Sequence, residues 1–328
     1  MSDASHLYRT THSAMGTEYS LYLFARSREE ADSIAQPVFQ EVDRVDALLS
    51  NYQPGSELSR INRHAFSQDI TTDPETFRFL ETCLAWSERS HGAFDISVGK
   101  LMKVWKFFGA SGELPSPEDV TAARRDVGWE KIRLDRERRT VRFLSAGIEL
   151  DPGGIGKGYA IDRAVRILLA NNVASALLSA GSSTIYALGA PPNDAGWKVR
   201  VPSPRSGATT ISTVLLRDTS LSTANLSEKH FIHDGHLYGA IMDPQTLRPV
   251  EATLQATVIS PSATDSDALS NAMFVMGPEE RARLLENRLH ECALIVRDMP
   301  PPAEYETIRW PAEVFENELA ELAATKEN

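Results

Sequence analysis

The chain has 328 residues, of which 42% are apolar and 24% are charged, and it carries a formal net charge of −11 at pH 7. This composition is ordinary for a folded protein, and the length allows one large domain or two joined lobes. The negative charge excludes a broad nucleic-acid-binding surface, which needs clustered Lys and Arg.

The first half of the chain predicts a mixture of helices and strands after a polar start. Residues 1–12 are polar, and we expect them to form a flexible N-terminus. The spacing of apolar residues then predicts, in chain order, a turn and strand over 14–24, a long helix over 28–49, one helical turn over 57–62, a helix over 74–90, a loop over 109–117, a short helix over 119–127 and strands over 132–134 and 140–144.

The second half continues this mixture with more strands. The pattern predicts a helix from 160, strands over 174–183 and 185–189, a hairpin of 197–201 with 210–216, strands near 229–232, 237–242 and 256–260, helices over 266–275 and 278–287, and a strand over 293–296. Residues 301–328 are expected to be an acidic tail that is helical from 311.

Cysteine usage and apolar run lengths indicate the compartment. The only cysteines are Cys83 and Cys292, which excludes a disulfide framework and a zinc site built from cysteines. The sequence contains no run of about 18 apolar residues and no apolar leader. We therefore expect a cytoplasmic protein without a membrane span.

A glycine-rich stretch, Asp151-Pro152-Gly153-Gly154-Ile155-Gly156-Lys157-Gly158, stands between a strand-like run and the helix from 160. Four glycines in six positions allow a ligand to approach the backbone closely, and the helix N-terminus and Lys157 supply positive charge. These features indicate a site for phosphate or another anion. The spacing is neither that of a Walker loop nor that of a dinucleotide fingerprint. A tight turn whose glycines serve only the backbone is an equal alternative.

Two oxygen-bearing side chains lie one helical turn apart near the C-terminal end of the chain. Asp267 and Asn271 stand at i and i+4, so both face the same side of the predicted helix. Hard oxygen ligands of this kind suit Mg²⁺. The alternative is that Asp267 only favours the first turn of the helix through the helix dipole.

Several short motifs, taken together and in order, resemble one protein family. They are Met15-Gly16-Thr17, Ser50-Asn51-Tyr52 with Ser56 and Asn62, Gly92-Ala93-Phe94-Asp95, the stretch from Asp151 to Asp162, Gly181, Ser222-Thr223, Asp243-Pro244 with Thr246, and Asp267 ahead of Gly277. Over residues 13–300 the chain resembles the ApbE family of FAD:protein FMN transferases.

The resemblance implies a fold, an activity and a set of site residues. The implied fold is α+β, related to the T-fold, a single domain of two entwined lobes over 13–300 with FAD in the cleft between them. The implied reaction uses Mg²⁺ to move the FMN half of FAD onto a Ser or Thr of an acceptor protein and releases AMP. The acceptor carries a Ser/Thr-Gly-Ala-Thr/Ser core.

Family positions can be carried over residue by residue. The residues implied to bind FAD are Met15, Tyr52, Ala93, Phe94, Asp95, Lys157, Asp162, Gly181, Thr223 and Ile241. The implied metal ligands are the backbone carbonyl of Ala160 and the side chains of Asp267 and Asn271. Asp267 is also the implied catalytic residue.

The chain departs from the family pattern at one end of the expected site. Ala240 stands where the family commonly has a histidine, which is thought to help the acceptor hydroxyl lose its proton. Thr223-Ala224-Asn225 replaces Thr-Ser-Gly, Ser182 replaces a second glycine, and Asn271 replaces a threonine. An FAD-binding protein that has lost or altered the transferase activity, as a flavin carrier or a hydrolase of the FAD pyrophosphate, is therefore the alternative.

Two further features of the sequence bear on the acceptor side of the reaction. His233 and His236 lie near Ala240 and are candidates to replace the missing base, although histidines beside a turn are more often simply exposed. Ser206-Gly207-Ala208-Thr209 reproduces the acceptor core, which raises self-flavinylation at Thr209 as a motif-only hypothesis.

Overall fold

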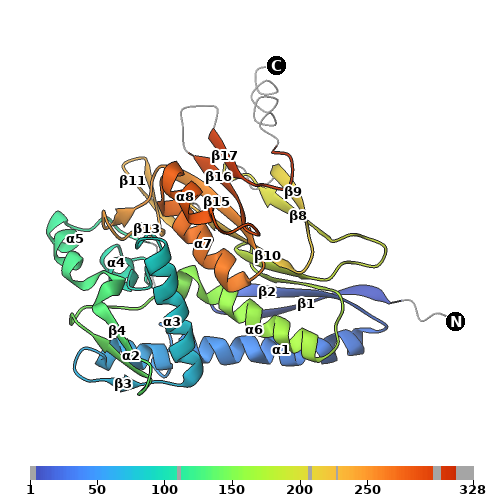
Figure 1. Cartoon of the computed structure of the whole chain (residues 1–328), viewed down its shortest axis with the longest axis horizontal. Helices are drawn as coiled ribbons and strands as arrows, with labels where there is room; N and C mark the ends of the chain where they lie inside the picture. The colour runs from blue at the N-terminus through green and yellow to red at the C-terminus, as the bar shows by residue number, and fades with distance from the viewer. Residues whose placement is uncertain (1–4, 109–111, 206–208, 227, 298–303, 315–328) are drawn as a thin grey trace.

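The computed structural model of the chain describes residues 5–108, 112–205, 209–226, 228–297 and 304–314. It shows two lobes side by side (Figure 1). One lobe is built on a large antiparallel sheet, and the other consists of helices and small sheets. The α+β class predicted from the sequence is confirmed.

The large sheet runs through the whole first lobe. Among the described residues it has eight strands in the order β1-β2-β6-β7-β10-β15-β16-β17, and every neighbouring pair is antiparallel. The strands are β1 (His6–Ala14), β2 (Thr17–Ala25), β6 (Ala176–Ala180), β7 (Thr184–Leu188), β10 (Thr219–Asn225), β15 (Thr253–Ser260), β16 (Cys292–Arg297) and β17 (Glu304–Ile308).

Three helices cover one face of this sheet and form the main core with it. They are α1 (Arg28–Leu49), α6 (Gly156–Ala170) and α7 (Ala263–Val275), and α6 lies between the other two (Figure 1). Helix α1 begins where the Ser27 side chain accepts a hydrogen bond from the amide of Glu30, at 3.2 Å. Its buried face carries Ala31, Ala35, Val38, Phe39, Val42, Val45 and Leu49, the spacing expected of an amphipathic helix.

The opposite face of the sheet is covered by a hairpin. Strands β8 (Trp197–Pro202) and β9 (Thr210–Leu216) pair antiparallel and pack Trp197, Val199 and Val214 against apolar residues of the sheet. The predicted hairpin is thereby confirmed.

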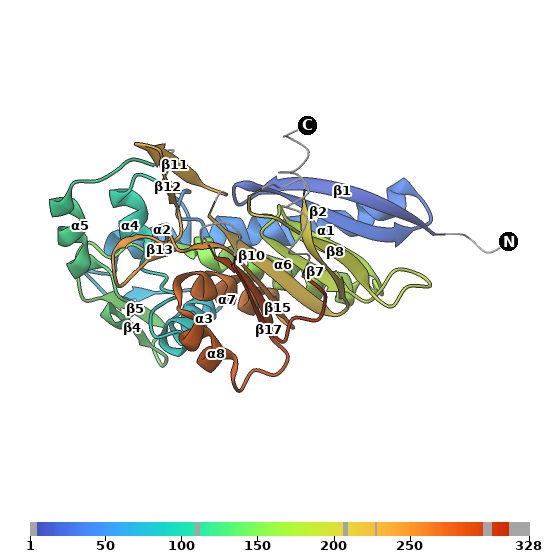
Figure 2. The same ribbon diagram turned by 90° about the horizontal axis from the view of Figure 1, so that it is seen from above.

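The second lobe contains the remaining elements. Its helices are α2 (Glu57–His64), α3 (Pro74–Arg89), α4 (Gly99–Val104) and α5 (Pro117–Ala123), and β3 (Ile70–Thr71), β4 (Ile132–Asp135) and β5 (Thr140–Phe143) form a small sheet. Near this lobe lie the two-stranded pairs of β11 (His230–His233) with β12 (His236–Gly239) and of β13 (Met242–Asp243) with β14 (Arg248–Pro249) (Figure 2). Helix α8 (Pro278–Leu285) follows α7 in the chain.

The structure corrects the expectations for both ends of the chain. Residues 6–12, expected to belong to a flexible N-terminus, are part of β1, and residues 304–308, expected to lie in an acidic tail, form β17. Residues 311–314 are not helical, and 315–328 lie outside the described residues. Both strands are at the edges of the sheet, where one side has no partner strand, so polar residues are tolerated and the sequences do not read as buried strands.

Candidate functional site

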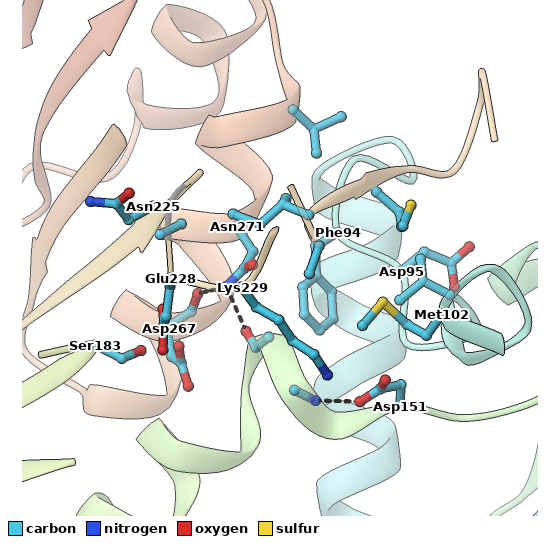
Figure 3. Close-up of a pocket in the computed structure, with 18 of the residues that line it drawn as sticks. Phe94, Asp95, Met102, Asp151, Ser183, Asn225, Glu228, Lys229, Asp267 and Asn271 are labelled. Atoms are coloured by element: carbon cyan, nitrogen blue, oxygen red, sulfur yellow. Dashed lines mark hydrogen bonds between the residues drawn. The ribbon is translucent and has the colours of Figure 1, made fainter. Parts of the chain in front are cut away.

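A pocket lies where the two lobes meet, and it gathers residues that are far apart in sequence (Figure 3). It is bordered by the glycine-rich turn and the start of α6, by α7, by the end of β10 with the segment that follows, and by the turn at 93–95 with α4. Eight of the residues predicted for the site line it: Ala93, Phe94, Asp95, Lys157, Thr223, Ile241, Asp267 and Asn271.

The glycine-rich turn contributes both to the pocket and to the packing of two helices. Gly153, Gly154 and Lys157 line the pocket, as an anion site requires. Gly158 has a packing role instead, because a Cβ at this position would collide with the backbone carbonyl of Ala263 and lie 2.8 Å from Cβ of Asp267. The absence of a side chain therefore lets α6 approach α7 closely.

Asp267 is the most strongly buried acidic residue that lines the pocket, and it lies where α6 and α7 meet. The residue is 2% exposed, and its Oδ2 accepts a hydrogen bond from the backbone N–H of Gly158, at 2.9 Å. Burial raises the pKa of Asp267 to about 6, while the nearby ammonium of Lys157 and the Gly158 bond oppose that rise. The carboxylate is thus held at a fixed place, close to a cation, at the wall of the pocket.

Asn271 lies one turn further along α7 and also faces the pocket. Its Nδ2 donates to the carbonyl of Gly154, at 3.3 Å, and to the carbonyl of Asp267, at 3.0 Å. Within the described residues no hydrogen bond uses its Oδ1. The amide is therefore fixed by its nitrogen and leaves an oxygen for a ligand.

Two lysines carry the positive charge of the pocket. Lys157 Nζ lies 3.4 Å from Oε1 of Glu228, a residue of the segment after β10. Lys229, the next residue in that segment, donates from Nζ to the backbone carbonyl of Phe107 and so connects the two lobes. Its charge also partly offsets the burial that raises the pKa of Asp151.

The turn at 93–95 is fixed by a second buried carboxylate. Asp95 accepts hydrogen bonds from the backbone amides of Ser97, at 2.8 Å, and Trp129, at 2.9 Å. Burial raises its pKa to about 6, and these bonds reduce the rise. Asp95 therefore holds Ala93 and Phe94 in place along the wall of the pocket.

Five of the predicted site residues do not line this pocket, and one of them, Asp162, has a clear structural role. Both oxygens of Asp162 are used at the start of α7, where they accept hydrogen bonds from Ser262 Oγ, the amide of Ala263, and the amide and Oγ1 of Thr264. A carboxylate that satisfies the free amides of a helix N-terminus is a cap. Ala160 is fully buried within α6.

The other three predicted residues also lie outside the pocket. Gly181 forms the turn between β6 and β7 at φ +56°, and a Cβ there would meet Oγ1 of Thr17, at 2.5 Å. Met15 accepts a hydrogen bond at Sδ from Tyr19 Oη, at 3.1 Å. Tyr52 lines a separate, second pocket and stacks on Phe108, with ring centroids 4.4 Å apart.

The position of the missing histidine lies at the pocket, but the two histidines considered as its replacement do not. Ala240 lines the pocket, whereas His233 and His236 lie on the exposed β11–β12 hairpin and do not. His236 Nε2 is instead 3.3 Å from Glu251. Of the self-flavinylation motif, Ser206-Gly207-Ala208 lies outside the described residues.

Three charged residues that the sequence analysis gave no role line the pocket: Asp151, Glu228 and Lys229. Asp151 belongs to the glycine-rich stretch, and its position before Pro152 and Gly153 was the available signal. Glu228 and Lys229 lie in an irregular segment after Ser222-Thr223, where no periodic pattern predicts which way a side chain faces.

The side chains at the pocket show whether a metal ion could bind there. The described part of the chain holds no cluster of three or more His, Cys, Asp or Glu side chains that could bind a metal. Asp267 and Asn271 nevertheless present a carboxylate and an amide oxygen on one face of α7. Asp267 is held at Oδ2 by the amide of Gly158, and Asn271 is held at Nδ2 by the carbonyl of Gly154. Oxygen donors of this kind fit Mg²⁺ and do not suit a softer metal.

The raised pKa of Asp267 gives a prediction for the metal-free protein. The folded state binds a proton more tightly than the unfolded state, so stability due to this group is present below about pH 4 and is lost as pH rises through about 6. A rise from 3.8 to about 6 corresponds to about 3 kcal/mol. The unfolding free energy of Asp267→Asn minus that of the wild type should therefore increase by about 3 kcal/mol as the pH rises from 4 to 8.

Urea unfolding of both proteins with EDTA, at several pH values, measures this difference. Taking the difference between variant and wild type removes the contributions of other titrating groups. A difference that stays constant across this pH range would show that Asp267 ionises as it does in the unfolded chain.

The chain matches known proteins over most of its length. The model of the ApbE family matches residues 15–296. Among curated relatives, the FAD:protein FMN transferase of Treponema pallidum (strain Nichols) is 30% identical over 79% of this chain and 76% of its own length. The FAD:protein FMN transferase of Klebsiella pneumoniae (strain 342) is 28% identical over 88% of both chains.

Solved structures agree with the sequence comparisons. The crystal structure of the ApbE protein of Thermotoga maritima has a TM-score of 0.84 and 27% identity, and the match covers 97% of this chain and 99% of that one. The flavinyl transferase ApbE of Pseudomonas stutzeri has a TM-score of 0.80 and 26% identity, with 93% and 95% covered. Separately, no helix among the described residues is long and apolar enough to cross a bilayer.

Proposed function

Because the chain belongs to the ApbE family, we propose that it transfers the FMN moiety of FAD to a Ser or Thr hydroxyl of an acceptor protein, with Mg²⁺ present, and releases AMP. The names of its curated relatives support flavin transfer between FAD and a protein. The observation that carries the proposal is the pocket that brings Lys157, Asp267 and Asn271 together beside a glycine-rich turn.

The chemistry of FAD accounts for this combination of groups. A pyrophosphate carries negative charge. Lys157, in the first turn of α6, supplies a cation for it, and the N-terminus of the helix supplies backbone donors. Gly153 and Gly154 expose their backbone to the pocket without a side chain in the way. The turn is therefore suited to bind the phosphates of FAD, and the wall at 93–95 to bind an adjoining part of the molecule.

Asp267 and Asn271 are the residues that would hold Mg²⁺. Ala160, whose carbonyl the family resemblance implies as a further ligand, is fully buried in α6 and does not line the pocket. Mg²⁺ bound there would neutralise the charge that develops on the phosphates as the bond between them breaks. The protein contributes by holding the carboxylate of Asp267 through Gly158 and the amide of Asn271 through Gly154. Such fixed positions provide much of the acceleration in phosphoryl transfer.

One observation favours a second function. Ala240 places a methyl group at the pocket where the family commonly has an imidazole. A protein of this kind could bind FAD without transferring FMN, or could hydrolyse the pyrophosphate. The acceptor for the transfer reaction would carry the Ser/Thr-Gly-Ala-Thr/Ser core, and modification of the chain's own Thr209 stays a prediction.

The proposal is tested by following AMP release chromatographically with FAD and an acceptor peptide, with Mg²⁺ or with EDTA. Transfer predicts AMP only when both the peptide and Mg²⁺ are present. AMP that forms equally without the peptide supports hydrolysis instead. FAD that stays intact while bound supports a carrier.

A further inference from the structure

Transfer to a hydroxyl requires a group that takes up the hydroxyl proton, and the pocket holds several candidates. The question rests on the proposed function, because only a transferase needs such a group. In a phosphoryl transfer to Ser or Thr, the acceptor oxygen forms a new bond to phosphorus, the bond between phosphorus and the bridging oxygen breaks, and the proton of the hydroxyl must leave.

Carboxylates are the proton acceptors available at this pocket. Three of the lining carboxylates are buried, and each accepts a hydrogen bond from a backbone amide: Asp95, Asp151 and Asp267. Glu228 differs in both respects. Its side chain is 48% exposed, and the partner of its carboxylate within the described residues is the ammonium of Lys157, at 3.4 Å. A protein acceptor arriving from solvent therefore meets Glu228 and not the buried groups.

We propose that Glu228 is the residue that accepts the proton of the acceptor hydroxyl. The hydroxyl oxygen attacks the phosphorus of the FMN half of FAD, its proton passes to a carboxylate oxygen of Glu228, and AMP leaves with the electron pair of the broken P–O bond. Glu228 later releases the proton to water. No oxidant or additional reactant is needed.

The contact with Lys157 links this role to FAD binding. Lys157 is the more enclosed partner, with a side chain that is 19% exposed, and it also faces Asp267, whose pKa its charge lowers. A phosphate that binds Lys157 competes with Glu228 for the same ammonium. Binding of FAD thus frees the carboxylate of Glu228 at the point where the acceptor arrives.

The residues next to Glu228 cannot accept the proton of the hydroxyl themselves. Lys229 is a cation that already donates to the carbonyl of Phe107, so it is not a proton acceptor. Ala240 is paired with the same segment, because its amide donates to the carbonyl of Lys229, at 2.9 Å. Its methyl group has no proton-accepting atom. From the helices packed here, Lys157 of α6 forms an ion pair with Glu228, and Asp267 of α7 lies within range of its charge.

The test compares Glu228→Gln with the wild type and with Glu251→Gln. Glu251 is a matched control because its side chain is 49% exposed and its partner, His236, lies outside the pocket. Glu228→Gln keeps the size and a hydrogen-bonding oxygen but cannot take a proton at neutral pH. The expected result is a fall of about 100-fold or more in the rate of FMN transfer at saturating FAD and peptide. FAD affinity should be unchanged or higher, and Glu251→Gln should match the wild type.

A second measurement separates proton transfer from a merely structural contact. Glu228→Ala should regain transfer as sodium formate is added, while sodium chloride at equal ionic strength should have no effect. Transfer by Glu228→Gln within threefold of the wild type, or no response of Glu228→Ala to formate, would overturn the proposal. A wild type that makes no flavinylated peptide would remove the proposed function itself, and this proposal with it.

Discussion

Replacing Asp267 by alanine is expected to lower the rate of FMN transfer by a factor of about 1000 or more. The change removes the carboxylate that, with Asn271, would hold Mg²⁺ at the pocket, and stabilisation of this kind is worth several kcal/mol in the transition state. It also leaves the amide of Gly158 without its acceptor, at a cost of about 1–3 kcal/mol in folding free energy. Single-turnover transfer and thermal unfolding, measured on the same preparation, separate the two effects.

Two further variants make this result interpretable. Asp267→Asn keeps an oxygen for the Gly158 amide but loses the charge, so it should fold and still lack transfer. Asp265→Asn is the matched control on the same helix, because Asp265 accepts from Trp86 Nε1, at 2.9 Å, away from the pocket. An Asp267→Asn protein that transfers FMN at the wild-type rate would refute the role given to this carboxylate.

Replacing Gly158 by alanine is expected to destabilise the protein by about 3 kcal/mol or more. The new Cβ would collide with the carbonyl of Ala263 and lie 2.8 Å from Cβ of Asp267. Overpacking in a core costs about 1–3 kcal/mol, and a backbone atom cannot rotate away as a side chain can. Helices α6 and α7 must therefore separate, which also displaces Asp267 from the pocket.

Gly156→Ala is the matched control in the first turn of the same helix. A Cβ there would meet Cβ of Pro152 at 3.3 Å and Cε of Met15 at 3.4 Å, contacts that small shifts relieve. Its unfolding free energy should lie within about 1 kcal/mol of the wild type. Equal melting temperatures for Gly158→Ala and the wild type would show that the two helices are not packed as described.

The elements that were predicted well have strong periodic patterns. The long helix over 28–49 was predicted with the bounds that α1 has, because its apolar residues recur at helical spacing over several turns. The edge strands β1 and β17 were missed for the opposite reason. Each is paired on one side only, so its sequence is polar enough to resemble a tail.

The site could be predicted only where a local motif carries it. The glycine-rich turn with Lys157, and the pair Asp267 and Asn271, are readable because their geometry follows from one helix each. The partner of Lys157 is 71 residues away in sequence, in a segment without a pattern, so Glu228 could not be found from the sequence. Asp162 shows the converse, because its place in the motif did not reveal that it caps a helix about 100 residues further along the chain.

The most direct test of the account is the intact mass of an acceptor protein bearing the Ser/Thr-Gly-Ala-Thr/Ser core, after incubation with this protein, FAD and Mg²⁺. The account predicts that the acceptor gains the mass of one FMN group, with one AMP released for each acceptor modified. An unmodified acceptor, in a sample where FAD is bound or has been cleaved to free FMN and AMP, would contradict it.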